Sequence, residues 1–514
     1  MFRFADLLTK AARQWPDLPA VTCAAGTLSW AGLADRCHRL ADVLMARGVG
    51  PGDRVAYLGF NGRLGVETLF AAPLFGAISV PLNFRLSDRE LIETVNDCRP
   101  KAIIVDGAHT DTCARIREAC PSVVCVLAQT PGPDMEGYED ALSVAVPAAK
   151  TPSAGEDPLV IFYTGGTTGR SKGVMLSHTN IFANSLGILA NWDFGETPVY
   201  AFSGPLFHSA AGARIFGTVL TGTHSVLQTR FDVKALFSLI ETHRIEIAQF
   251  VPTMIAMLLD HPAIGDHDLS SLRLITYGGA PMPPALLNRV LQAFPGVRFA
   301  QAFGMTEASP IVAYLNPEDH EDLGAPRLNS VGRPGHFVDL IAVDETGSPL
   351  PTGQVGELIV RGPNVMLGYW EQPDLTRQVL RDGWYHTGDA GYLDQDGYVF
   401  VSGRIKDMII TGGENVYPIE VENVLSLHPA VREVAVIGTP DDKWGERVHA
   451  VVVLHKGASE TAEGLIAYCR DRLAHYKCPS IVTFWLGPLP LTKVNKTDKI
   501  ALRAALAPTG EAHD

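Results

Sequence analysis

Short apolar runs alternate with amphipathic segments along the first half of the chain. Strands are expected in the runs at 54–58, 101–105 and 123–127. Residues 86–98 predict a helix, because Ser87 and Glu90 have the spacing of a capping box. Residues 129–157 are richer in Pro, Gly and Ala and are predicted to form a surface connection. This alternation favours α/β organisation.

A second alternation begins near Phe231, with strands expected at 245–251 and 272–277 and a helix over 283–294. After Asp389 the pattern changes to Gly- and Asp-rich hairpins over 392–401, followed by a unit of about a hundred residues. We therefore expect a large N-terminal α/β domain over 1–403, made of several subdomains with sheets flanked by helices. A small α+β domain would occupy 404–514, with the boundary near Lys406.

Composition supports this division, because 514 residues with 46% apolar content can bury more than one core. The net charge of −14 argues against nonspecific nucleic-acid binding. No segment is apolar and long enough to predict a membrane span, and residues 1–8 do not resemble a secretory signal. The eight cysteines have no metal-ligand spacing. A cytoplasmic enzyme is expected. The sequence does not determine the oligomeric state, and a homodimer is one possibility.

The segment with the clearest chemistry follows the apolar run 159–162. Its glycines allow backbone N–H groups to converge on an anion, its threonines add donors, and its lysine adds a positive charge. It is not a Walker A loop. An ordinary turn with a surface lysine is an equally good interpretation of this stretch alone. The candidate phosphate-binding residues are Thr164, Gly165, Gly166, Thr167, Thr168, Gly169 and Lys172.

Five blocks in a fixed order make the chain resemble the acyl-adenylate-forming superfamily, which includes acyl-CoA synthetases, stand-alone adenylation domains and luciferases. The resemblance extends from the opening helix to about Arg503. The blocks are the phosphate loop with Val174 to His178, Gln301 to Glu307, Gly356 to Leu358 with Gly368 and Tyr369, Tyr385 to Asp389, and Gly403 to Asp407.

The resemblance implies that ATP activates a carboxylate by transferring AMP to it, with Mg²⁺ as cofactor. Glu307 would bind Mg²⁺, and Thr306 would donate to the α-phosphate. Asp389 would accept from the ribose hydroxyls, with Arg404 donating to the same sugar. Taken singly, the two acids would be solvated loop residues. The nucleotide base would meet Gly279, Ala280, Pro281 and Phe303, and Gly304 and Met305 would also belong to the ATP/AMP site.

The same resemblance places the catalytic lysine near the C-terminus, at Lys496, although Lys493 and Lys499 are close enough to compete for the assignment. Lys406 would be the hinge of the small domain. Three positions depart from the family pattern: Gly165 for serine, Ser171 for proline and Asn495 for glycine. Weaker ATP affinity would follow from a lost hydroxyl, worth about 1 kcal/mol. Loss of activity is not implied, since an inactive relative would be expected to lack Lys496 or Glu307, but a catalytically impaired nucleotide-binding paralogue is kept as one alternative.

The acceptor is expected to be CoA, because Gly412, Gly413 and Glu414 resemble the loop that lines the pantetheine tunnel of CoA ligases. An enzyme that loads a separate carrier protein is the other alternative. His208 stands where amino-acid-activating relatives have aspartate, so a substrate ammonium would lack an anionic partner. A fatty, alicyclic or aryl acid is expected in a pocket formed by Phe207, His208, Gly212, Phe250, Thr253, Tyr277 and Gly278.

Overall fold

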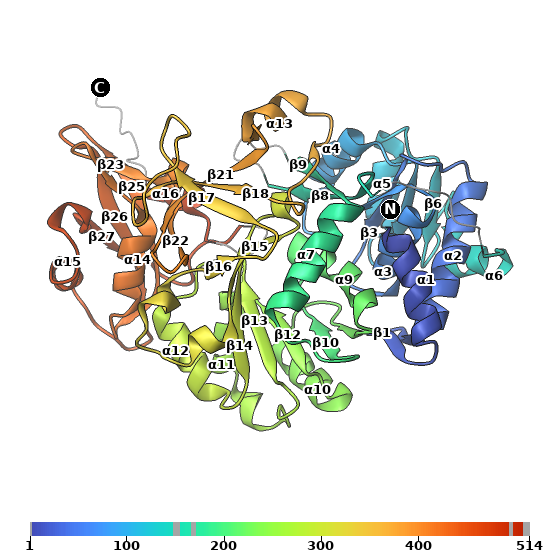
Figure 1. Cartoon of the computed structure of the whole chain (residues 1–514), viewed down its shortest axis with the longest axis horizontal. Coiled ribbons are helices and arrows are strands. Elements are labelled where there is room, and N and C mark those ends of the chain that lie inside the picture. Colours follow the sequence, from blue (N-terminus) through green and yellow to red (C-terminus); the bar gives the residue numbers. More distant parts are fainter. Residues whose placement is uncertain (1–2, 148–154, 166–170, 493–496, 507–514) are drawn as a thin grey trace.

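The computed structural model describes residues 3–147, 155–165, 171–492 and 497–506. A large body contains the first three sheets, and a smaller unit with the fourth sheet lies at its side, shown in orange and red in Figure 1. The expected fold class, a large N-terminal α/β domain with a small C-terminal domain, is confirmed. Among the described residues, no helix has the length and apolar character needed to cross a bilayer.

The first sheet has eight strands in the order β19-β9-β8-β4-β3-β5-β6-β7. Strands β3, β4, β5 and β6 are parallel, while β8 and β9 form an antiparallel pair. The strands are β3 (Arg54–Leu58), β4 (Ile78–Pro81), β5 (Ala102–Val105), β6 (Cys125–Ala128), β7 (Glu136–Gly137), β8 (Pro158–Thr164), β9 (Lys172–Ser177) and β19 (Gly368–Tyr369). The accompanying helices are α1 (Phe4–Gln14), α2 (Trp30–Ala46), α3 (Arg63–Leu74), α4 (Asp88–Cys98), α5 (Thr110–Ala119) and α6 (Tyr138–Val144).

The second sheet has nine strands in the order β16-β15-β14-β13-β12-β10-β11-β1-β2. In Figure 1 it lies between α10, α11 and α12 on its outer side and α7 and α9 on its inner side. The strands are β1 (Pro19–Cys23), β2 (Gly26–Ser29), β10 (Val199–Phe202), β11 (His224–Leu227), β12 (Ile247–Phe250), β13 (Leu274–Gly278), β14 (Arg298–Gly304), β15 (Ile311–Leu315) and β16 (Arg333–Pro334). The helices are α7 (His178–Asn191), α8 (Ser209–Gly212), α9 (Arg214–Gly217), α10 (Val233–His243), α11 (Pro252–Asp260) and α12 (Pro284–Ala293).

A third sheet follows the second and precedes the small unit. It contains β17 (Asp339–Val343), β18 (Gly356–Arg361), β20 (Leu380–Arg381), β21 (Trp384–Leu393) and β22 (Val399–Arg404), with α13 (Pro373–Val379) beside it. Strand β22 ends at Arg404, and the next strand, β23, begins at Ile409 in a separate sheet. The expected boundary near Lys406 lies in the short helical turn between these two sheets, η6 (Ile405–Asp407).

The small unit packs helices against its sheet, which has the order β24-β23-β26-β25 with β27 beside β26. Its own buried cluster includes Ile409, Val421, Val436 and Leu465. The elements are β23 (Ile409–Thr411), β24 (Glu414–Val416), β25 (Val431–Asp441), β26 (Gly445–Leu454), β27 (Ile481–Phe484), α14 (Pro418–Ser426), α15 (Ala462–Arg470) and α16 (Lys499–Leu506).

Local sequence explains where several elements begin. Ser87 caps α4, and the predicted capping box with Glu90 is present. Ser177 caps α7 by accepting from the backbone N–H of Asn180. All five residues of β13 are buried, as is typical of a parallel strand covered by helices on both faces.

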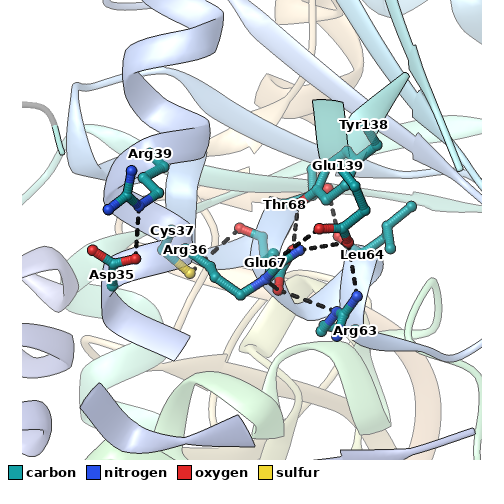
Figure 2. A network of polar contacts seen from close by, with 10 residues as sticks. All are labelled: Asp35, Arg36, Cys37, Arg39, Arg63, Leu64, Glu67, Thr68, Tyr138 and Glu139. Carbon is teal, nitrogen blue, oxygen red and sulfur yellow. Dashed lines mark hydrogen bonds and ion pairs between the residues drawn. The ribbon is translucent and has the colours of Figure 1, made fainter. Parts of the chain in front are cut away.

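The segment 129–157 differs from the surface connection expected from its composition, because it contains β7 and α6. The Tyr138 side chain is buried and donates a hydrogen bond to Glu67, a fully buried carboxylate of α3. Arg36 of α2 contacts Glu67 at 2.5 Å and Glu139 of α6 at 2.8 Å. Arg63 also reaches Glu139, at 2.7 Å (Figure 2). This network fixes α6 against α2 and α3, and composition does not reveal it.

Candidate active site

Two of the phosphate-loop candidates, Thr164 and Lys172, pair with each other at the end of the β8–β9 hairpin. Tyr163 donates a hydrogen bond to Asp97 of α4, and the indole N–H of Trp370 donates to the carbonyl of the same residue at 3.2 Å. These contacts fix the base of the hairpin to the first sheet. Gly165 is exposed beyond that base. Gly166, Thr167, Thr168 and Gly169 lie outside the described residues.

Glu307 and Thr306 follow the carboxyl end of β14, the edge at which open α/β sheets bind ligands. The Thr306 hydroxyl is 2.8 Å from that of Ser209, the first residue of α8. Tyr369 donates a hydrogen bond to Glu307 Oε1 at 2.9 Å. A β-bulge at Phe303 and Gly304 precedes this turn, and a Cβ on Gly304 would collide with the carbonyl of Pro310.

Lys172 reaches the same place, because its ammonium lies 5.3 Å from the centre of the Tyr369 ring. Tyr369 therefore contacts both the phosphate-loop lysine and Glu307. Burial raises the pKa of the Tyr369 hydroxyl, and the Glu307 carboxylate raises it further. The hydroxyl thus stays protonated and able to donate. The sequence blocks contain Tyr369, but nothing in their pattern indicated that it joins Lys172 to Glu307.

Further positive charge gathers beside Lys172. Burial lowers the pKa of Lys406, Asp407 opposes this change, and Arg404 and Lys172 lower the pKa further by repulsion. Lys406, the predicted hinge residue, thus interacts electrostatically with Arg404 and Lys172, two predicted nucleotide-binding residues. Such a group of cations suits an anionic ligand with several phosphates.

Asp389 and Arg404 face each other on β21 and β22, with Arg404 Nε 3.0 Å from Asp389 Oδ1. Asp389 is 6% exposed, and its backbone N–H donates to the Thr387 hydroxyl at 3.0 Å. Arg404 also donates to the carbonyl of Thr387 at 2.8 Å. The arrangement holds a carboxylate and a guanidinium side by side, as the predicted ribose contacts require.

The predicted base-binding turn follows β13. Gly278 is buried, and a Cβ there would collide with the carbonyl of Ala302 on the neighbouring strand. Gly279 is exposed and has φ of +78°, which side-chain-bearing residues rarely adopt. Ala280 and Pro281 complete the turn, and Phe303 is partly buried with Met305 against the core of the third sheet. The turn and the end of β14 are adjacent, since Gly278 pairs with Ala302.

Three of the predicted acyl-pocket residues lie in α8 or directly before it. Phe207 is buried against Phe84, with ring centres 5.2 Å apart. His208 caps α8 by accepting from the N–H of Ala210 at 3.3 Å. Gly212 has no room for a Cβ, which would meet the Phe162 ring. Because Ser209 contacts Thr306, this part of the predicted pocket lies next to the predicted catalytic residues.

Three other predicted pocket residues are placed differently. Phe250 and Tyr277 point to the outer side of the second sheet, into a core formed with α10, α11 and α12. Tyr277 is hydrogen-bonded there to His320 at 2.9 Å. Thr253 is exposed on α11. The residues adjacent to the two aromatics, Gln249 and Thr276, point to the inner side instead, because successive strand residues face opposite sides.

The predicted CoA-tunnel residues form the turn of the β23–β24 hairpin. Gly412 and Gly413 have φ of +61° and +84°. The Gly412 N–H donates to the carbonyl of Trp444 at 2.8 Å, and a Cβ on Gly412 would meet the Trp444 ring. Glu414 begins β24 and is exposed. The predicted catalytic Lys496 lies outside the described residues, as does Asn495.

The side chains of the candidate site can provide only some of the ligands of Mg²⁺, so a bound substrate would have to provide the others. Among the described residues, no group of three or more His, Cys, Asp or Glu side chains converges. Glu307 offers one carboxylate beside Thr306, and Mg²⁺ is commonly bound through one or two carboxylates together with phosphates and water. A magnesium ion at Glu307 would thus depend on phosphate oxygens for its remaining ligands.

Comparison with known proteins identifies the class. Residues 8–370 match the AMP-binding enzyme family, and residues 420–496 match the AMP-binding enzyme C-terminal domain. The chain belongs to the AMP-binding enzyme family, within the acyl-adenylate-forming superfamily.

Particular relatives match nearly the whole chain. A feruloyl-CoA synthase from Amycolatopsis sp is 41% identical over 493 residues, covering 96% of each protein. An indoleacetate–CoA ligase from Aromatoleum aromaticum is 38% identical, covering 93% of each. The structure of the amide bond synthetase McbA from Marinactinospora thermotolerans superimposes with a TM-score of 0.90 at 32% identity, covering 98% of this chain and 99% of McbA.

Proposed function

We propose that this protein is an AMP-forming acyl-CoA ligase whose substrate is an aromatic carboxylic acid. The reaction class, an ATP-dependent acid–thiol ligase acting through an acyl-adenylate, is that of the family and of relatives named as CoA ligases. The single observation that supports it best is the contact of Tyr369 with both Lys172 and Glu307 beside Thr306. The aromatic acid is proposed because relatives at 41% and 38% identity are named for aromatic acids.

In the first step, a carboxylate oxygen of the acid attacks the α-phosphorus of ATP, and the bond to pyrophosphate breaks. The attack brings anions together, so Lys172 and the Thr306 hydroxyl would stabilise the phosphoryl oxygens. Glu307 would hold Mg²⁺, which supplies further charge stabilisation when bound. Asp389 and Arg404 would hold the ribose, and Lys496 would bridge the two reacting anions.

In the second step, the CoA thiol attacks the acyl carbon of the adenylate, AMP leaves, and the thiol proton passes to solvent or a base. The Gly412–Gly413 turn would line the path of the thiol after the small domain rotates about Lys406. Domain limits at 403 and 404, a cytoplasmic location and a homodimer remain proposals. Sedimentation of the purified chain would test the homodimer.

The decisive experiment incubates the enzyme with ATP, Mg²⁺, CoA and a panel of aromatic, alicyclic and fatty acids, and detects thioesters by mass spectrometry. We expect CoA thioesters of aromatic acids. If acyl-AMP and pyrophosphate form but no thioester is detected, the acceptor is not CoA but another molecule, such as a carrier protein or an amine. The likeness to an amide bond synthetase justifies including an amine in that assay. ATP binding without pyrophosphate release from any acid would favour the impaired paralogue.

A further inference from the structure

The inner face of the second sheet carries a buried polar group next to the predicted acyl pocket. Thr276 is 1% exposed and lies two residues before Gly278 on the same face of β13. Gln249 occupies the corresponding face of β12 and pairs with Thr276. The Tyr200 hydroxyl donates to Gln249 Oε1 at 3.4 Å. Tyr200 packs in the core cluster that includes residues of α7 and α9, and Gln249 and Thr276 lie on the same face of the sheet by strand alternation. Figure 1 shows α7 and α9 on this side of the sheet.

Arg214, the first residue of α9, brings a positive charge to this group. It is 6% exposed, and its guanidinium carbon lies 5.6 Å from the centre of the Trp192 ring and 5.7 Å from that of Tyr200. Its Nε and Nη1 atoms have no hydrogen-bond partner. Within the described part of the chain, no acidic side chain forms an ion pair with Arg214.

Such a guanidinium is costly. Arginine does not lose its proton in proteins, so burial cannot neutralise it as it can a lysine or histidine. A buried charge is normally paired with an opposite charge. The aromatic rings beside Arg214 offset only part of the free-energy cost of removing its guanidinium from water. The most direct compensation is an anion or acidic oxygen that accepts from Nε and Nη1. A cavity beside Arg214, lined also by Tyr200, Phe202, Ser185 and Thr218, leaves space for one.

The position of this group relative to the catalytic end sets the size of its ligand. Thr276 lies two residues before Gly278, and Tyr200 is level with Leu274, four residues before it. At about 3.3 Å per residue, the polar group lies roughly 7–13 Å below the turn that borders the reacting carboxylate. An aromatic acid with one ring and a short side chain spans that depth.

We propose that Arg214, assisted by Tyr200, Gln249 and Thr276, binds an acidic oxygen at the far end of the acyl substrate, so that the preferred acids carry a second carboxyl or phenolic hydroxyl. This assignment rests on the proposed function, because it names the substrate of that same site. A free chloride ion could also bind to Arg214 in place of the acidic oxygen of a substrate. The experiment therefore has to distinguish a substrate group from a free anion.

The experiment compares cinnamic, 4-hydroxycinnamic and 4-carboxycinnamic acids with the wild type, Arg214→Met and Arg214→Lys, by pyrophosphate release. The wild type is expected to favour the two substituted acids. Arg214→Met is expected to lower kcat/KM for these acids by about 10- to 100-fold and for cinnamic acid by less than about threefold. Arg214→Lys should restore part of the loss. Arg289→Met, which removes a surface ion pair with Asp260, is the matched control and should change nothing.

Two further measurements keep the outcomes separate. Thr276→Val gives a second test with little change in volume, and circular dichroism shows which variants fold. Melting of the wild type with each acid, or with chloride in place of gluconate, measures binding without any turnover. Equal losses for all three acids, or stabilisation by chloride alone, would overturn the substrate assignment. Absence of thioester with the acid preference intact would overturn the CoA acceptor instead.

Discussion

Tyr369→Phe tests whether the hydroxyl that contacts Glu307 matters for adenylation. The substitution removes one oxygen from a buried side chain and leaves the ring on which Lys172 lies. Glu307 Oε1 then loses a donor at 2.9 Å. A hydrogen bond to a charged group contributes about 1.5–3 kcal/mol. If that stabilisation is expressed in the transition state, kcat/KM for ATP falls by about 10- to 150-fold.

Pyrophosphate release should be followed at saturating acid while ATP and Mg²⁺ are varied separately. We expect the Mg²⁺ concentration for half-maximal rate to rise, because Tyr369 acts by orienting the proposed Mg²⁺ ligand. Melting temperature would not report such an effect. Tyr392→Phe is the control, since Tyr392 stacks on Phe400 near the turn of the β21–β22 hairpin, at the other end from the Asp389–Arg404 pair. A Tyr369→Phe enzyme with unchanged Mg²⁺ dependence and a rate within about twofold of wild type would refute the reasoning.

Three further predictions use other parts of the structure. Asp389→Asn should raise KM for ATP by about tenfold or more, since the ribose loses an anionic acceptor, and an unchanged KM would remove Asp389 from the site. Glu67→Gln should lower the free energy of unfolding by about 1–3 kcal/mol in urea, because Arg36 and Tyr138 exchange a charged acceptor for a neutral amide while Arg36 keeps Glu139; a loss below about 0.5 kcal/mol would contradict this. His178 accepts from the Phe4 N–H, and burial lowers its pKa to about 4 from 6.5. Because the unfolded chain binds the proton first, stability should fall by up to about 3 kcal/mol as pH drops from 6.5 to 4, and His178→Gln should flatten that slope.

The sequence predicted the order and class of the elements well. Apolar runs coincide with β3, β5 and β6, and the Ser87–Glu90 spacing marks the start of α4. The face of the sheet to which each strand residue points was harder to predict than the positions of the strands, as Tyr277 and Thr276 illustrate. Helices cover both faces of β13, so every residue is buried and no alternation of polarity separates the two faces. The pairing of Tyr277 with His320 and of Thr276 with the inner layer appears only in three dimensions.

The candidate site shows the same limit. In the structure Lys172 begins β9, Thr306 and Glu307 follow β14, Arg404 ends β22, and Asp389 lies within β21. Their mutual contacts could not be read from spacing, because Tyr369 lies 62 residues beyond the Glu307 that it contacts. The network around Glu67 was not predicted for a related reason. Tyr138 lies 71 residues beyond the Glu67 that it contacts, in a segment whose composition indicates a loop.

The network around Glu67 also makes the packing of three helices interdependent. Within α2 and α3 alone, Arg36 and Arg63 share a single carboxylate, so that pair of helices holds one excess positive charge in the cluster. Glu139 arrives only with α6, later in the chain, and contacts both arginines. Docking of α6 therefore neutralises the cluster at the same moment as it buries Tyr138. The pairing of α2 with α3 is thus completed by a third partner that makes their assembly cooperative.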